Sequence, residues 1–313
     1  MANESPPPEP NISAGKAPDV SAAIAAASAP APATAASSVV PTPGRSRRSR
    51  HDSWWEIRQP LPRLARLLLS FVAPLFLLGV WCLLSYGDMV PSYFLPTPTE
   101  VLKGLVQLFA QHDLLLAIWT STRRIALGFL LAGATALPLG ILMGAFEPIN
   151  RVLNPIVAPL RYMPISAFIP LLILWFGIFE KQKIAFLFLG VFVYLLPVVV
   201  SAIRAVPEEL MQTAYTLGAT RWQVIRTVLV PSALPEIFDS FRVMNAISWT
   251  YVILAEAVNP EYGLGYMVEL ARTHQKASWS FAGLFVIGGI GLITDAIIHA
   301  ISAALFRWRE NHA

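Results

Sequence analysis

Residues 207–231, PEELMQTAYTLGATRWQVIRTVLVP, form the longest polar interruption in a chain that otherwise consists of apolar runs. The stretch predicts a short helix over Glu208–Leu217, a break at Gly218 and a second helix over about Thr220–Val230. The proline that opens it suits the first turn of a helix, and the two glutamates that follow suit the positive end of the helix dipole. Glycine readily takes the left-handed conformation that ends helices, and Pro231 is expected to separate the second helix from the next apolar run.

The composition is that of a membrane protein. Apolar residues make up 55% of the 313 residues and charged residues 13%, whereas globular domains carry about 25% charged residues. Several runs of about 18 or more apolar residues predict transmembrane helices. The single Cys82 excludes a disulfide framework, and the five histidines have no metal-ligand spacing, so we expect no metal site.

The apolar runs predict an all-α, polytopic membrane protein. Residues 1–53 are rich in Pro, Ala and Ser, and we expect a disordered tail there, with the membrane domain over residues 54–313. Residues Thr99–Ala110 predict an amphipathic helix in the membrane interface. Six spans are expected, at Leu67–Gly87, Ile118–Phe146, Tyr162–Phe179, Ile184–Ile203, Pro235–Val258 and Trp279–Phe306.

The distribution of basic residues predicts the orientation of these spans. The segment before the first span holds seven arginines between Arg45 and Arg66, and further arginines flank the second-to-third and fourth-to-fifth connections. Because cytoplasmic segments carry an excess of Lys and Arg, both termini and the 207–231 loop are expected in the cytoplasm. The arginines before the first span are also expected to bind anionic lipid headgroups, although a partner-docking role stays open.

The 207–231 loop resembles the EAA loop of bacterial ABC importer permeases. The family pattern is E-A-A, three residues, Gly, nine residues and I-x-L-P. It falls here on Gln212, Thr213, Ala214, Gly218 and Pro231, with Gln212 in place of the acid and Thr213 in place of an alanine. LPTPTEVL (95–102), STRRIALGFLLA (121–132), PIVAPLRYMPISAFIPLLILWFGI (155–178) and GLGY (263–266) are similar to the nitrate/sulfonate/taurine/bicarbonate branch. The resemblance covers roughly residues 60–310 and implies a type I importer permease fold.

The resemblance also implies an assembly in the bacterial inner membrane. It would comprise two permease chains, which we expect to form a homodimer, two cytoplasmic ABC ATPase subunits and an extracytoplasmic substrate-binding protein. ATP and Mg²⁺ would bind the ATPase, because this chain has no G-x-x-x-x-G-K-[S/T] loop and no catalytic constellation, so we expect no enzyme and no nucleic-acid partner. The residues expected to contact the ATPase are Glu208, Glu209, Gln212, Thr213, Ala214, Leu217, Gly218, Ala219, Arg221 and Pro231.

Two groups of residues are candidates for the translocation path. Arg242, Asn245, Trp249 and Glu256 recur at helical spacing on one face of the fifth span, where ionisable groups usually face a wet cavity or another helix. They either line the path or are satisfied by neighbouring helices, and a structural or gating role suits the acid best. The second group, Arg161, Tyr162 and Met163, begins the third span, where two prolines are expected to break the helix.

Other ionisable residues leave alternatives open. Arg123 and Arg124 would attract an anion, dock a binding protein or reach the headgroups. Asp295 and His299, four residues apart on the sixth span, could pair with each other or with Arg204; we expect them to make structural polar contacts between helices, with a proton relay as the alternative.

An alternative function is that of an ion- or proton-coupled secondary transporter, which would be expected to contain inverted repeats and more ionisable pairs at mid-membrane depth. The sequence leaves the substrate open.

Overall fold

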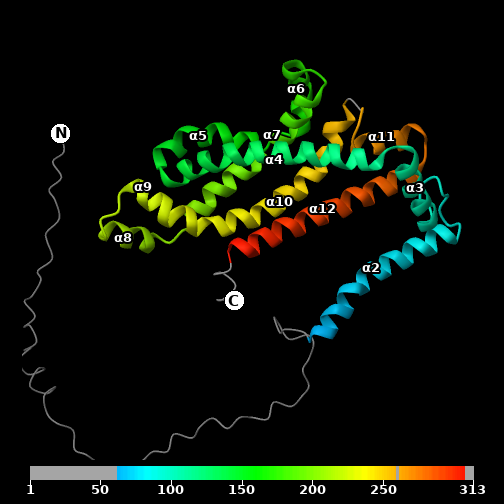
Figure 1. The fold of residues 1–313 in the computed structure, drawn as a ribbon, viewed down its shortest axis with the longest axis horizontal. Coiled ribbons are helices and arrows are strands. Elements are labelled where there is room, and N and C mark those ends of the chain that lie inside the picture. The colour runs from blue at the N-terminus through cyan, green and yellow to red at the C-terminus, as the bar shows by residue number, and fades with distance from the viewer. Residues whose placement is uncertain (1–61, 259–260, 307–313) are drawn as a thin grey trace, which may run out of the picture. The chain divides into compact units, whose positions relative to one another are not determined.

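The computed structural model describes residues 62–258 and 261–306, and all regular structure in these ranges is helical. The predicted tail over residues 1–53, with its boundary at residue 53, lies outside them. The elements in chain order (Figure 1) are α2 Arg63–Tyr86, α3 Pro98–Gln111, α4 Leu114–Ala145, α5 Glu147–Leu160, η1 Ile165–Phe168, α6 Ile169–Phe176, α7 Glu180–Arg204, α8 Glu208–Thr216, α9 Arg221–Val224, η2 Ile225–Leu229, α10 Val230–Ala257, α11 Leu264–Thr273 and α12 Ala277–Leu305.

Among the described residues, four helices are long and apolar enough to cross a membrane: Leu64–Tyr86, Leu114–Ala145, Glu180–Arg204 and Ala277–Leu305. A bent pair, Glu147–Leu160 with Ile165–Phe176, raises the number to five if it forms one span. The fifth predicted span, Pro235–Val258, corresponds to α10, which has 28 residues but contains four charged ones. Two of these, Arg242 and Glu256, form ion pairs with other helices. Such pairing allows a polar helix to lie within a membrane bundle.

The third predicted span differs most from expectation. The segment that connects the second and third predicted spans, before Tyr162, is helix α5, which contains Pro155 and Pro159. The break falls between α5 and η1, where Pro164 is extended, and the two halves bend by 94°. Pro170 does not break the helix, because it lies in the first turn of α6, where its missing N–H has no partner to lose.

Helices α4 and α7 form the centre of the fold by packing small residues against large ones. An ideal Cβ at Gly128, Gly140 or Gly144 would lie 2.7–2.8 Å from the side chains of Leu187, Val199 and Ile203, respectively. From one contact to the next, the residue numbers rise on both α4 and α7. The two helices therefore run in the same direction. The small residues recur every four positions on α4, and the apolar residues recur every four positions on α7. The full sets are Gly128, Ala132, Ala136, Gly140 and Gly144 on α4, and Leu187, Val191, Leu195, Val199 and Ile203 on α7. Small residues allow membrane helices to approach closely.

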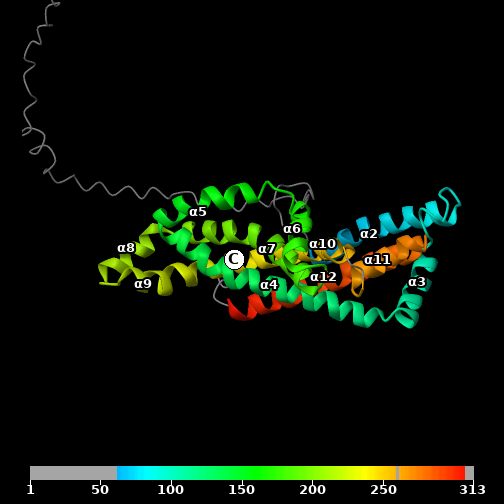
Figure 2. The ribbon, with the colours of Figure 1, turned by 90° about the horizontal axis from the view of Figure 1, so that it is seen from above.

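The bundle places the polar loop and the α3–α11 region at opposite ends. Figures 1 and 2 both show α8 and α9 beyond one end of α4 and α7, and α3 and α11 near the other. We call these the loop end and the α11 end. The amphipathic helix predicted over Thr99–Ala110 is confirmed as α3 and begins with a capping box between Thr97 and Glu100. Its position at a membrane interface stays a prediction.

Candidate coupling loop and translocation sites

The predicted helix–Gly–helix loop is confirmed. Helix α8 ends at Thr216, and Gly218 takes a left-handed conformation with φ +84°. The N–H of Gly218 donates to the carbonyl of Tyr215 (2.9 Å), and the N–H of Ala219 donates to the carbonyl of Ala214 (3.0 Å). This pair of hydrogen bonds is a Schellman motif, which fixes the angle at which the chain leaves α8.

The second helix of the loop begins at a well-defined cap but does not end at Pro231. Thr220 and Gln223 form a capping box, in which the Gln223 side chain accepts from the Thr220 N–H at 2.7 Å. α9 then continues through the π-helical turn η2 directly into α10. A proline lacks an N–H, and its ring clashes with the carbonyl four residues before it. The wider π turn immediately before Pro231 relieves that clash and keeps the helix continuous.

The loop presents apolar side chains to its surroundings. Leu217 is 84% exposed and Trp222 is 59% exposed, and none of the residues of α8 is buried. Ala214 and Ala219 instead pack against the apolar core that includes Val224. Of the ten residues predicted to contact an ATPase, these two hold the loop on the bundle. The other eight are exposed, namely Glu208, Glu209, Gln212, Thr213, Leu217, Gly218, Arg221 and Pro231.

Asn245 and Trp249 of α10 lie beside a cavity of about 440 Å³ between α10 and α12. The Asn245 amide and the Trp249 indole N–H both donate to the hydroxyl of Thr294 on α12, each at 3.0 Å. Most of the cavity wall is apolar, and Asp295 lies at its edge. The predicted polar stripe on α10 therefore faces α12 at these two positions.

Arg242 and Asp295 form a bidentate ion pair. The Nε and Nη2 of Arg242 donate to the two carboxylate oxygens at 2.9 and 2.7 Å. Asp295 therefore makes the expected polar contact between helices, but its ion-pair partner is Arg242 and not Arg204, which binds Glu147 at 2.7 Å at the loop end. The pair that forms joins two different helices, which sequence spacing along α12 alone does not reveal.

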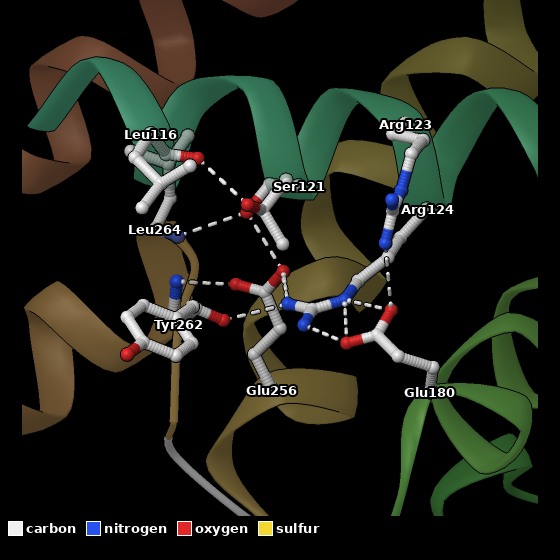
Figure 3. Close-up of polar contacts among 10 residues, drawn as sticks. Leu116, Ser121, Arg123, Arg124, Glu180, Glu256, Tyr262 and Leu264 are labelled. Atoms are coloured by element: carbon white, nitrogen blue, oxygen red, sulfur yellow. Dashed lines mark hydrogen bonds and ion pairs between the residues drawn. The ribbon is translucent and has the colours of Figure 1, made fainter.

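Glu256 is fully buried in a polar cluster at the α11 end (Figure 3). One carboxylate oxygen accepts from Arg124 Nη1 and from the Ser121 hydroxyl, each at 2.7 Å. The other accepts from the backbone N–H of Gly265 at 2.7 Å. Arg124, which is only 2% exposed, also binds Glu180 at the start of α7. We call Ser121, Arg124, Glu180 and Glu256 the Arg124 cluster.

The Arg124 cluster fastens the turn before α11 to three helices. Arg124 Nη1 donates to the carbonyl of Tyr262 at 2.6 Å, and the N–H of Leu264 donates to the Ser121 hydroxyl at 2.8 Å (Figure 3). Gly263 has φ +129°, and a Cβ there would lie 2.3 Å from the Glu256 carboxylate. The cluster therefore closes Glu256 off within this chain, which favours the structural alternative for that residue.

Sequence reasoning missed Ser121 and Glu180 as partners in this cluster. One signal in the sequence could have indicated the cluster. Arg123 and Arg124 lie near the start of the second predicted span, on the side where the positive-inside rule predicts few basic residues. Of the roles considered for this pair, headgroup contact suits only Arg123, which is 51% exposed and lies 3.6 Å from Glu180. Arg124 is buried and fully engaged.

The residues predicted at the start of the third span separate in the structure. Arg161 caps α5 and lines a polar cavity between α5 and α7. Tyr162 is 84% exposed and Met163 is 47% exposed. A position for all three in one path stays a prediction.

Comparison with known proteins identifies the family. Residues 136–308 match the family described as binding-protein-dependent transport system inner membrane component. The taurine transport system permease protein TauC of Escherichia coli (strain K12) is 31% identical over 265 residues, which cover 83% of this chain and 94% of TauC. The putative aliphatic sulfonates transport permease protein SsuC of Bacillus subtilis (strain 168) is 31% identical over 243 residues, covering 78% of this chain and 88% of SsuC.

A solved structure supports the fold. A chain of the MetNI methionine ABC transporter in an inward-facing conformation superimposes with a TM-score of 0.53 at 21% identity, covering 62% of this chain and 94% of that chain. The helical permease fold expected from the sequence is confirmed. The chain therefore belongs to the binding-protein-dependent transport system inner membrane component family, as a permease subunit of an ABC importer.

Proposed function

We propose that this permease imports a small sulfonate of the taurine type. The observation that carries the proposal is the similarity to two sulfonate permeases, which extends over 94% of TauC and 88% of SsuC. Nitrate and bicarbonate, the other solutes implied by the sequence resemblance, have no support among these two relatives. ABC importers receive their solute from a binding protein. The solute site of that binding protein therefore constrains the solute class more strongly than the permease sequence does.

The 207–231 loop is the contact with a separate ATPase. Leu217 and Trp222 are large apolar side chains exposed on a projecting pair of short helices, and exposed apolar groups of this kind commonly mark protein interfaces. The Schellman motif and the capping box make the pair stiff, so a displacement applied at the loop passes to α10. ATP and Mg²⁺ belong to that partner chain, and hydrolysis takes place there.

The assembly contains two copies of this chain, two ATPase subunits and an extracytoplasmic binding protein in a bacterial inner membrane. Arginines gather near the loop end, including Arg151, Arg161, Arg204 and Arg221, and the positive-inside rule then places this end and both termini in the cytoplasm. The arginines that precede α2 contact anionic lipid headgroups. The α11 end faces the binding protein.

The translocation path follows the α10 face that includes Arg242, Asn245 and Trp249, together with Arg161 to Met163 near the bend between α5 and α6. In support, Asn245 and Trp249 border the 440 Å³ cavity, and Arg161 borders a second one. Glu256 supports the path from the Arg124 cluster and does not contact the solute.

The proposal is tested with vesicles that contain the chain, its ATPase and its binding protein. We expect uptake of radiolabelled taurine that requires ATP. Gly218→Val should abolish the uptake while leaving the chain folded, because a β-branched residue is strained at φ +84°. Gly218→Asn is the matched control, because asparagine tolerates the left-handed region, and it should retain uptake.

Three results would each overturn part of the proposal. ATP-dependent uptake of another solute class, with taurine excluded, would refute the choice of a sulfonate. Uptake driven by a proton gradient that persists without any ATPase would favour the secondary transporter, and unchanged coupling in Gly218→Val would refute the role of the loop.

A further inference from the structure

The cavity that Arg161 borders is a polar groove between α5 and α7 with a volume of about 210 Å³. Asn150, Asn154 and Arg161 recur along one face of α5, and Ser201 and Arg204 face them from α7. From Asn150 to Arg161 the groove follows about 16 Å of helix, at about 1.5 Å per residue. It begins at the loop end, beside Glu147 and Arg204, and continues towards the bend after α5.

The hydrogen-bond donors of this groove are largely unused. The side chains of Asn150, Asn154 and Arg161 make no hydrogen bond or ion pair with any residue that the structure describes. Arg204 binds Glu147, and that carboxylate also binds Arg151, so one of the two groove arginines is partly neutralised. A guanidinium and two amides remain, and all three groups can donate hydrogen bonds to an oxyanion.

The position of the groove within a span makes these free donors significant. α5 and α6 together form the broken candidate span, and polar groups in spans are costly unless they face water, protein or a ligand. Asn154 and Arg161 are exposed on the surface of the chain. A lipid-tail environment would leave both without partners, so this face needs water, protein or a polar ligand beside it.

We propose that the groove lined by Asn150, Asn154, Arg161, Ser201 and Arg204 binds a tetrahedral oxyanion, either the sulfonate of the transported solute or the phosphate of a phospholipid headgroup. The cavity is smaller than the roughly 300–1,000 Å³ typical of sites for drug-sized ligands, which fits a small anion or a single headgroup. Both occupants present the same oxygen atoms to Arg161. The sulfonate version rests on the proposed function, and the phosphate version does not.

The groove can be tested with the full chain in complex with its ATPase. Equilibrium dialysis with radiolabelled taurine, with inorganic sulfate as competitor, measures the sulfonate. Native mass spectrometry after purification from membranes containing phosphatidylglycerol counts retained lipid. Arg161→Gln should weaken binding of one probe about tenfold or more, since hydrogen bonds to charged groups are worth at least that factor.

Two further variants make the test decisive. Asn154→Leu replaces an exposed donor with an apolar side chain of similar size and should weaken the same probe, so the test survives if Arg161→Gln fails to fold. Arg272→Gln removes an exposed arginine of α11 outside the groove and should change binding less than twofold.

The outcomes separate the two occupants. Loss of taurine binding in the groove variants assigns the sulfonate, and loss of retained phosphatidylglycerol assigns the headgroup. If neither probe depends on Arg161 or Asn154 more than on Arg272, the groove proposal is wrong. A wild-type complex that transports no sulfonate but loses lipid in Arg161→Gln would overturn the proposed function and leave the groove intact.

Discussion

The seam between α4 and α7 predicts opposite effects for two glycine-to-alanine changes on one helix. At Gly140, an added Cβ would lie 2.7 Å from both Cβ and Cγ1 of Val199. At Gly133, only seven residues earlier in α4, an added Cβ would meet no atom within 4 Å. The pair therefore compares a packed position with an open one in the same helical and membrane environment.

The magnitude follows from the geometry. Carbon atoms pack best at about 3.5–4.0 Å, so Gly140→Ala forces the helices apart by close to 1 Å, and valine in a helix has essentially one rotamer with which to yield. Overpacking of this kind costs about 1–3 kcal/mol. Alanine also gains about 1 kcal/mol over glycine in a helix interior, and this gain applies at both positions. The difference between the two variants thus isolates the packing cost, at about 1–3 kcal/mol.

The assay is thermal unfolding of the detergent-purified chain, followed by size-exclusion chromatography. Each kcal/mol shifts the melting temperature of a domain of this size by roughly 2–4 °C. We expect Gly133→Ala to melt at or above the wild-type temperature, and Gly140→Ala to melt at least about 2 °C below Gly133→Ala. Equal melting temperatures, or a more stable Gly140→Ala, would refute the close approach of α4 and α7.

Three further predictions use the same preparation. Glu256→Ala leaves Arg124 buried with one partner fewer and should cost about 3–5 kcal/mol, seen as a large drop in melting temperature. Asp295→Asn breaks a pair whose side chains are 37% and 32% exposed, so its melting temperature should fall far less than that of Glu256→Ala, and an equally large fall would contradict this ranking. Thr220→Ala removes the cap of α9 and should speed tryptic cleavage after Arg221, whereas Thr220→Ser should match wild type; equal cleavage of the two variants would count against the cap.

Local signals in the sequence were sufficient for the helices and for the loop. Hydropathy located the long spans to within a few residues, and the glycine at 218 was the correct break because its conformation depends on its immediate neighbours. Prolines were a poorer guide. Pro155, Pro159 and Pro231 all lie in continuous helix, whereas Pro164 lies at a break. A proline leaves a backbone carbonyl without its helical hydrogen-bond partner. In a bundle, neighbouring groups and local π turns satisfy that carbonyl, so a proline alone does not determine where a helix ends.

The pairing of charged groups was beyond sequence reasoning for a different reason. Arg124 and Glu256 are 132 residues apart, and their contact requires α4, α7 and α10 to converge at one end. The seam that brings them together is visible only as a four-residue period of small residues on α4 and large ones on α7. The period indicates that the helices pack, but the register follows from which glycine meets which side chain. Only after the register is fixed do Arg124 and Glu180 come within reach.

The continuity of α9, η2 and α10 constrains how a loop movement reaches the proposed solute path. One helix extends from Arg221, next to the loop glycine, to Ala257, next to Glu256. Its far end is held by the Arg124 cluster, where an isolated displacement would unpair buried charges at considerable cost. A movement imposed at the loop is therefore accommodated most cheaply near the loop, at the π turn Ile225–Leu229, because π turns already depart from the regular hydrogen-bond pattern. Between these two points lie Arg242, Asn245 and Trp249, so rotation of this segment alters their contacts with α12 while the α11 end stays fixed.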